Sequence, residues 1–423
     1  MRDYLLKRSV SDFDVATDAP PEEVLRLFRR VVPTGIKHGT VTVLFKGLSI
    51  ETTTFRTEAG YSDGRRPDAV TYARTIEEDL ARRDFAMNAL AYDLERDELV
   101  DPFGGQDDLS RRRIRAVGNP LERFGEDGLR PLRAIRFAAQ LGFEIDPPTE
   151  AAIPLSLDRF RLVSPERVRD ELQKLLLSSE PSAGLRILER TGMLAIVLPE
   201  LAACRGVEQK GLHRFDVLDH SFLAADAAPA DLTQRLAALL HDIGKPAAMA
   251  TGPEGVPTFY RHEEESAKLA GGLLRSLRFP NATIEAVLHL ISNHMFSYDD
   301  SWSDAAIRRF LARVGPGKVE DLFTLRLADG SAIAGIPADP RSLDPFRERI
   351  RLVLESDHAF GLRDLAIGGS ELKGLGVESG PAMGRILAEL LETVLDDPAL
   401  NDKARLLEIA AKLMAKHGIG RNP

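Results

Sequence analysis

The hydrophobic and polar positions change their period about 100 residues into the chain. Before that point, short β-branched runs such as VTVLF (41–45) and SIETTTF (49–55) alternate with helical patterns such as PPEEVLRLFRRV (20–31). After the turn-forming DPFGG (101–105), helical periodicity continues to the end with short breaks at Pro and Gly. This pattern predicts an α+β chain, with a small mixed α/β unit followed by an all-helical remainder.

Length and composition narrow the class of protein. At 423 residues the chain exceeds the size at which one hydrophobic core usually keeps growing, so we expect two to four domains. It is 43% hydrophobic and has no apolar run long enough to span a bilayer, so no membrane is implied. The charged N-terminus and the single cysteine, Cys204, favour a cytoplasmic location. The net charge of -9 means that any nucleic acid must be held by a local basic surface.

Two acidic residues near the N-terminus have the spacing of a magnesium site. Asp12 and Asp14 lie in VSDFDVAT, where strand alternation sends both carboxylates to one face and Phe13 into the core. Mg2+ takes hard oxygen ligands and completes its shell with substrate phosphate. Alone the pattern is weak, because an Asp-x-Asp pair in a loop is more often solvated or capping. The motifs that follow give it weight.

Four further motifs follow in order: HGTVTVLFKGLSIETTTFR (38–56), DGRRPDAV (63–70), RRDFAMNAL (82–90) and EDGLRPLRAIRFAAQLGF (126–143). With them the chain resembles the bacterial class II tRNA nucleotidyltransferases and poly(A) polymerases, whose head domain belongs to the DNA polymerase β superfamily. The resemblance implies a nucleotidyltransferase head (1–110), a nucleotide-selecting and RNA-binding neck (111–205), a body (206–335) and a tRNA-binding tail (336–423).

The resemblance also implies roles for individual residues. Asp12, Asp14 and Glu51 become the catalytic acids, the two aspartates as Mg2+ ligands. Guanidinium groups suit phosphate oxygens. Residues 111–175 contain 13 Lys or Arg against 10 Asp or Glu, and such a basic stretch suits RNA binding. The residues expected to bind the nucleotide are Arg2, Asp3, Arg82, Arg83, Asp84, Asn88, Asp127, Arg130, Arg133, Arg136 and Arg167.

Asp127 and Arg130 match the pair with which family members choose the incoming base. A carboxylate can accept from the exocyclic amine of cytosine or adenine, while Arg donates to neighbouring ring acceptors. Uracil and guanine carry a carbonyl oxygen where cytosine and adenine carry the amine. The carboxylate would then face another acceptor, so these bases are rejected. Taken without the other motifs, the two residues would be an ordinary (i, i+3) helix pair.

The start of the chain departs from the family pattern. In the family a strand and a Gly-Gly or Gly-Ser turn precede the Arg-Asp pair, and that turn brings backbone N–H groups to the triphosphate. Here the pair is Arg2-Asp3. We therefore expect a misassigned or truncated N-terminus. The alternative is a degenerate head, which would leave the second site, described next, as the surviving activity.

A second chemical centre is predicted from histidines and aspartates in the order H, HD, H, H, D, the signature of HD-superfamily phosphohydrolases. Imidazole and carboxylate together suit Mn, Fe, Ni, Co or Zn, and six ligands would allow two ions that activate water at a phosphate ester. In related nucleotidyltransferases this domain can process terminal or 2',3'-cyclic phosphates. The six residues are His220, His241, Asp242, His262, His294 and Asp329.

These features predict transfer of CMP or AMP from CTP or ATP to the 3' end of tRNA. The alternatives are a poly(A) polymerase, a CC-adding or A-adding enzyme, and a phosphohydrolase with a degenerate head. The segment FRTEAGYSDGRRPDAV (55–70) matches the family's flexible loop and favours A addition. The glycine-punctuated segment 368–401 resembles the family's helical tail, which grips the tRNA elbow.

Overall fold

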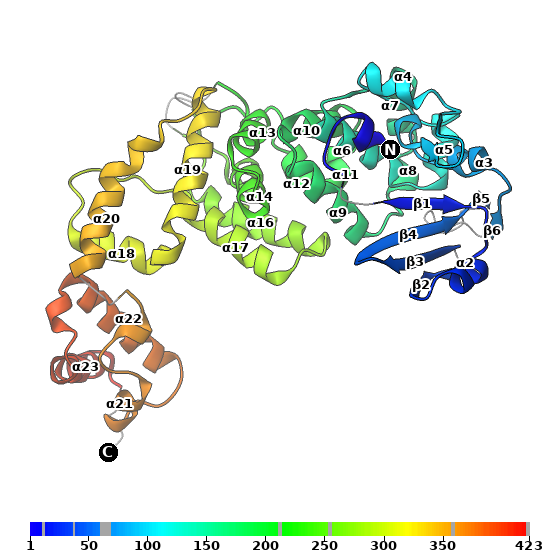
Figure 1. Ribbon diagram of the computed structural model, residues 1–423. Coiled ribbons are helices and arrows are strands. Elements are labelled where there is room, and N and C mark those ends of the chain that lie inside the picture. Colours follow the sequence, from blue (N-terminus) through cyan, green and yellow to red (C-terminus); the bar gives the residue numbers. More distant parts are fainter. Residues whose placement is uncertain are drawn as a thin grey trace.

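The computed structural model describes residues 1–10, 13–36, 39–59, 69–209, 214–252, 256–356 and 360–419. The molecule is elongated and curved, with a small sheet at one end, a continuous helical arm and a separate helical tail at the other end (Figure 1). The predicted α+β class is confirmed, because in the described part of the chain every strand after Val100 is only two residues long.

The N-terminal unit is built on a four-stranded sheet with the strand order β1-β4-β3-β2. Strand β1 runs parallel to β4, and the other neighbours pair antiparallel. On one face, Val24 of α2 packs against Val41 and Val43. The strands are β1 (Asp14–Thr17), β2 (Val31–Gly35), β3 (Thr40–Phe45) and β4 (Leu48–Thr54), and the helix is α2 (Pro21–Leu27).

The prediction that Phe13 points into the core is wrong. Its side chain is 63% exposed, because it precedes the first residue of β1, an edge strand with β4 as its neighbour and α2 packed farther along the sheet. Asp12 lies outside the described residues.

Small two-stranded sheets and short helices connect this unit to the helical arm. The pairs are β5 (Arg56–Ala59) with β6 (Ala69–Tyr72), β7 (Ala91–Asp93) with β8 (Glu98–Val100), and β9 (Arg113–Ile114) with β10 (Glu144–Ile145). The short helices are α1 (Arg2–Leu5), α3 (Ile76–Ala81), η2 (Ala86–Asn88) and α4 (Gly105–Ser110).

The helices of the neck begin at capping and proline signals that are visible in the sequence. Asn119 accepts from the Leu121 N–H at 3.0 Å and caps α5, and most of the helices that follow carry Pro at their first turn. They are α5 (Pro120–Glu126), α6 (Arg130–Leu141), α7 (Pro147–Leu155), α8 (Leu157–Phe160), α9 (Pro165–Leu176), α10 (Pro181–Arg190), α11 (Leu194–Val197) and α12 (Pro199–Ala202).

The body continues the core of the neck without a break, since one cluster of buried apolar side chains extends from Phe85 to Val353. Helix α13 packs against α14 and α19. The elements are α13 (Val217–Ala227), α14 (Leu232–Leu240), α15 (Lys245–Ala248), β11 (Ala250–Thr251), β12 (Pro257–Thr258), α16 (His262–Ser276), α17 (Asn281–Asn293), α18 (Asp304–Val314), α19 (Val319–Ala334) and α20 (Asp344–Ser356).

The tail has its own apolar core around Leu372, Leu390 and Leu406. It is joined to α18 by Arg308, whose Nε and Nη2 donate to the carbonyls of Leu395 and Asp396 at 2.6 and 3.1 Å. These bonds satisfy carbonyls at the end of a helix, where intrahelical donors are missing. The tail helices are α21 (Gly369–Gly374), α22 (Pro381–Asp396) and α23 (Lys403–His417). None of the helices in the described part of the chain combines the length and apolar composition needed to cross a membrane.

Candidate active sites

The uncovered face of the head sheet carries the two described acids of the predicted magnesium site. Asp14 on β1 and Glu51 on β4 are partners in the parallel register, and Thr42 on β3 is the next partner of Glu51. Register partners on neighbouring strands point to the same face of a sheet. A cavity of about 380 Å³ lies beside them, lined in part by Glu51, Thr42 and Arg56. Exposed carboxylates on one face form the oxygen donor set that Mg2+ prefers.

A chain of hydrogen bonds joins the first helix to the neck. Arg2 Nη1 donates to Asn88 Oδ1 at 2.9 Å, Asn88 Nδ2 donates to Asp84 Oδ1 at 3.0 Å, and Arg133 Nη2 lies 2.7 Å from Asp84 Oδ2. Burial opposes ionisation of Asp84, but Arg133 and Asn88 outweigh it and hold the pKa of this carboxyl below its ordinary value. Asp3 pairs with Arg2 at 2.9 Å. The structure thus brings five of the predicted nucleotide-binding residues together.

Other predicted arginines are paired with carboxylates that were not among the predicted site residues. Arg82 and Arg83 both pair with buried Asp79, at 2.8 and 3.4 Å. Arg136 Nε donates to buried Glu171 at 2.7 Å, and its guanidinium carbon lies 3.4 Å from the centre of the Phe137 ring. For Asp79 the signal was present, since it precedes Arg82 and Arg83 by three and four residues. Glu171 and Arg56 were missed because nothing in their local sequence distinguishes them from surface charges.

The two predicted base-reading residues are each held by a different partner. Asp127 forms a bidentate pair with Arg167, with Nη1–Oδ1 and Nη2–Oδ2 distances of 3.1 and 2.7 Å. The Arg130 guanidinium donates instead to Glu126 and to the carbonyls of Arg123 and Arg82. Asp127 and Arg130 are joined through the backbone, where the Arg130 N–H donates to the Asp127 carbonyl at 3.0 Å. The structure does not bring their side chains into an ion pair.

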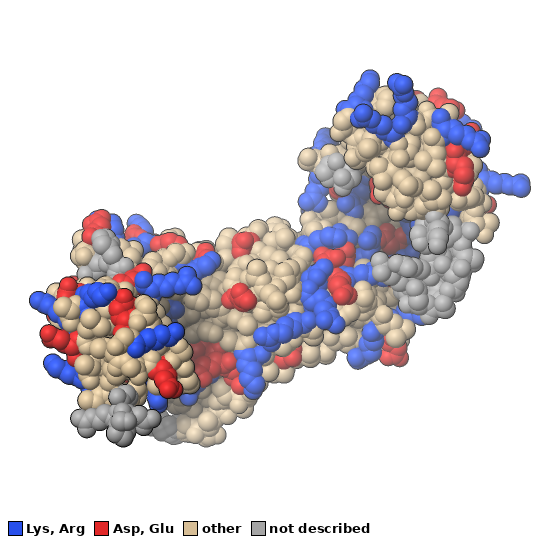
Figure 2. Space-filling view, turned by 90° about the horizontal axis from the view of Figure 1, so that it is seen from below, with Lys and Arg blue, Asp and Glu red and all other residues tan. Residues whose placement is uncertain are grey.

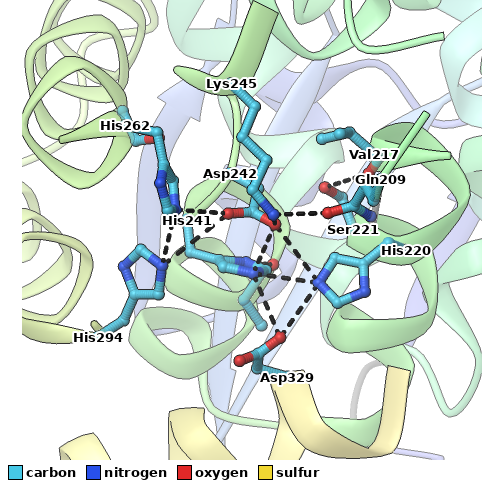
Figure 3. Close-up of polar contacts among 12 residues, drawn as sticks. Gln209, Val217, His220, Ser221, His241, Asp242, Lys245, His262, His294 and Asp329 are labelled. Atoms are coloured by element: carbon cyan, nitrogen blue, oxygen red, sulfur yellow. Dashed lines mark hydrogen bonds and ion pairs between the residues drawn. The ribbon is translucent and has the colours of Figure 1, made fainter. Parts of the chain in front are cut away.

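The six predicted residues of the histidine centre converge in the body, where all are buried (Figure 3). His220 comes from α13 and Asp329 from α19, while His241 and His294 end α14 and α17 and His262 begins α16. Five of them form two groups that could each hold an ion, His220–His241–Asp242 and Asp242–His262–His294.

The carboxylate of Asp242 divides its oxygens between the two groups. Oδ2 lies 3.5 and 3.2 Å from Nε2 of His220 and His241, while Oδ1 lies 3.1 and 3.9 Å from Nε2 of His262 and His294. Asp329 Oδ1 adds an oxygen 3.2 Å from His220 Nε2. Asp242 would therefore supply a ligand oxygen to each group if both groups held a metal ion.

Hydrogen bonds set the histidine tautomers for metal binding. Nδ1 of His241, His262 and His294 lies 2.7 to 2.9 Å from the carbonyls of Ala238, Phe259 and Ile291. A carbonyl can only accept, so Nδ1 carries the hydrogen and Nε2 presents its lone pair to the centre. Such outer bonds orient ligating histidines in metal sites. The residues present therefore fit divalent metal.

Gly244 allows the two halves of the centre to meet. A Cβ at this position would lie 2.4 Å from the backbone nitrogen of Ser266 and 2.5 Å from the carbonyl oxygen of His262. The Gly244 N–H also donates to Ser266 Oγ at 2.9 Å. Only glycine permits this approach, which brings the start of α16 against the His-Asp pair.

Burial and neighbouring charges shift the pKa values of several groups in the centre. Burial opposes protonation of His241, but Asp242 and Asp329 outweigh it and raise its pKa to about 10. Burial and the neighbouring His241 lower the pKa of His294 to about 3. The pKa of Asp242 lies well below its ordinary value, because His241 and Lys245 overcome its burial.

Lys245 and Gln209 are parts of this centre that the sequence reasoning missed. Lys245 is buried, and its Nζ lies 2.5 Å from both Asp242 Oδ2 and Gln209 Oε1. The signal for Lys245 was present, since it follows Asp242 by three residues and can therefore face it across one helical turn. Gln209 had no such signal.

The chain combines a sheet that carries exposed acids, an arginine-rich helical arm and a buried His-Asp centre. This combination is that of an RNA nucleotidyltransferase with an HD domain. Family models agree with this class. The "Poly A polymerase head domain" matches residues 1–115, the "Probable RNA and SrmB- binding site of polymerase A" matches residues 142–205, and the "HD domain" matches residues 213–330.

Similar proteins identify the family. The chain is 35% identical over 413 residues to the CCA-adding enzyme of Anoxybacillus flavithermus. The matched residues make up 97% of this chain and 90% of that protein. A crystal structure of the Bacillus stearothermophilus CCA-adding enzyme in complex with CTP is 29% identical, with a TM-score of 0.68 and coverage of 99% of this chain and 92% of that one. The Thermotoga maritima CCA-adding enzyme complexed with tRNA shares the fold, at 21% identity, a TM-score of 0.51 and coverage of 98% and 89%. The chain belongs to the CCA-adding enzyme family.

Proposed function

We propose that this protein adds CMP and AMP, from CTP and ATP, to the 3' end of tRNA, and that the reaction takes place on the head sheet. The observation that carries the proposal is the in-register pair of Asp14 and Glu51 on one sheet face. Together with Asp12, these acids would hold Mg2+, which stabilises charge at the phosphorus under attack. The 3'-hydroxyl oxygen forms a bond to the α-phosphorus and releases its proton to solvent, and the bond to the leaving pyrophosphate breaks.

The neck selects the nucleotide in this proposal. Asp127 accepts from the exocyclic amine of cytosine or adenine, and Arg130 donates to the ring. The cluster around Arg2 and Arg133 binds the phosphates. The net charge is -9, so RNA would follow a local basic path. Figure 2 shows Lys and Arg side chains in a band across the middle of the molecule, between the head and the tail. The proposed domains are the head (1–110), the neck (111–205), the body (206–335) and the tail (336–423).

A second activity, hydrolysis of phosphoesters, is favoured by the way Asp242 is shared between two ligand groups. Two metal ions, one held by each ligand group, would activate water and stabilise a leaving oxygen. The imidazole-rich donor set favours a transition metal over Mg2+. Terminal and 2',3'-cyclic phosphates of RNA are the proposed substrates.

One assay tests the transferase proposal and its alternatives. Purified protein is given tRNA ending at the discriminator base, at C or at CC, with each labelled nucleotide, and the products are sequenced. Stepwise C, C and A addition is expected. A addition alone would indicate an A-adding enzyme, and long A tracts would indicate a poly(A) polymerase. No incorporation would refute the transferase proposal in favour of a phosphohydrolase.

A double variant separates the second activity. His241→Ala with Asp242→Ala should abolish hydrolysis of cyclic or terminal phosphates and leave nucleotide addition intact, because the two sites lie on different elements far apart in the fold (Figure 1). Hydrolysis that survives this double substitution would rule out the HD centre as its source.

A further inference from the structure

The base-reading Asp127 is held by two elements at once. It lies in extended backbone between α5 and α6, where its Oδ1 accepts from the Leu129 N–H at 3.0 Å. Arg167, 40 residues later on α9, adds two parallel hydrogen bonds of 3.1 and 2.7 Å. Such a bidentate pair fixes the plane of the carboxylate as well as its position. The side chains of Asp127 and Arg167 remain 17% and 21% exposed, so a nucleotide can reach them.

The junction that carries Asp127 also packs closely against the segment leading to α9. A Cβ at Gly128 would lie 2.6 Å from the carbonyl oxygen of Arg159, so only glycine allows this approach. The Arg159 Nε in turn donates to the Gly125 carbonyl at 2.9 Å. These contacts hold the start of α6 at a constant distance from the helix that supplies Arg167.

Three donors leave little of the carboxylate available. An ionised carboxylate has about four acceptor positions. Among the described residues, Arg167 and the Leu129 N–H fill two positions on Oδ1 and one on Oδ2. The open position lies on Oδ2, and it can accept one N–H, as the amine of cytosine or adenine requires.

A carboxylate without this restraint would prefer a different base. Guanine presents its ring N1–H and its 2-amino group side by side, and these two donors match both oxygens of a free carboxylate. The Arg167 fork already occupies that bidentate edge of Asp127. A guanine would therefore have to displace a charge-assisted pair.

We propose, on the basis of the proposed function, that Arg167 is a positioning residue for base selection. Arg167 holds Asp127 so that Asp127 accepts one amine and cannot pair with guanine. Arg167 therefore acts through Asp127 and makes no contact with the phosphates. This assignment differs from the phosphate-binding role that its position in a basic helix suggests.

The test is nucleotide selectivity in the 423-residue chain. For Arg167→Ala, kcat/KM for CTP should fall and that for GTP should rise, so that the CTP-to-GTP ratio drops at least about tenfold. Arg167→Lys keeps the charge but loses the fork and should give an intermediate ratio. Melting temperatures establish that each variant is folded.

A matched control removes a similar ion pair elsewhere in the neck. Arg190 forms a fork with Glu150, also 40 residues apart, at 2.6 and 2.9 Å. Arg190→Ala should leave the CTP-to-GTP ratio unchanged.

Each other outcome is decisive. If Arg167→Ala lowers kcat/KM for all four nucleotides by one factor, its role is structural and the inference is overturned. If it raises CTP use at a constant ratio, Arg167 blocks the site, which also overturns it. A wild-type chain that incorporates nothing refutes the proposed function itself, whereas a selective wild type with an equally selective variant refutes only the role of Arg167.

Discussion

Gly244→Ala should disable one half of the HD centre without unfolding the body. The added methyl would lie 2.4 Å from the Ser266 nitrogen and 2.5 Å from the His262 carbonyl oxygen, about 1 Å closer than ordinary van der Waals contact. Both neighbours are backbone atoms of α16, so the start of this helix must move. Overpacking of this kind costs about 1–3 kcal/mol.

The movement displaces His262 first. Its Nε2 lies 3.1 Å from Asp242 Oδ1 and 3.3 Å from His294 Nε2, and both spacings belong to the second ligand group. The first group, His220, His241 and Asp242, takes none of its ligands from α16. Metal content should therefore fall from about two ions per chain toward one, and phosphoester hydrolysis should fall at least about tenfold. Nucleotide addition should not change.

The assay combines elemental analysis, hydrolysis of a 2',3'-cyclic phosphate and thermal melting. Gly272→Ala is the matched control, because it lies in the same helix and a Cβ there would meet no atom within 4 Å. It should stabilise the protein by about 0.5–1 kcal/mol and leave hydrolysis intact. Full metal content and full hydrolysis in Gly244→Ala would refute the argument that this close approach positions His262.

Three further perturbations address the rest of the molecule. Asp14→Ala should lower nucleotide addition at least about 100-fold in a single-turnover assay with little change in RNA affinity, and unchanged addition would remove it from the catalytic acids. Chelation should abolish phosphoester hydrolysis until Mn, Co or Ni is restored, while Mg2+ alone should restore nucleotide addition; hydrolysis that resists chelation would argue against a metal centre. Asp84→Asn should lower the free energy of unfolding by about 2 kcal/mol at neutral pH, since it weakens the pair with Arg133. Because the folded-state pKa of Asp84 is lowered, its contribution is complete above about pH 5 and is lost as the pH falls below about 4, so denaturant titrations that show a constant difference down to pH 2 would contradict it.

The sequence by itself indicated the order of the elements and the residue types that gather at both candidate sites. Strand alternation and β-branched runs predicted β3 and β4, and proline and capping residues marked the neck helices, because these signals act over one or two turns of chain. The order H, HD, H, H, D was sufficient to name the six buried His and Asp residues that converge in the body, although it missed the buried Lys245 beside them.

Only the tertiary structure decided how these groups face one another. That Asp14 stands opposite Glu51 depends on strand register, and that Asp242 turns one oxygen to each group depends on how α14 meets α16 at Gly244. The exposure of Phe13 follows from the edge position of β1, which alternation alone cannot reveal. The spacing of Asp127 and Arg130 taken alone fits an ordinary (i, i+3) helix pair, but the ion-pair partner of Asp127 is Arg167, because α9 packs beside α6. Local spacing determines which face a residue occupies, whereas packing between distant elements determines its partner.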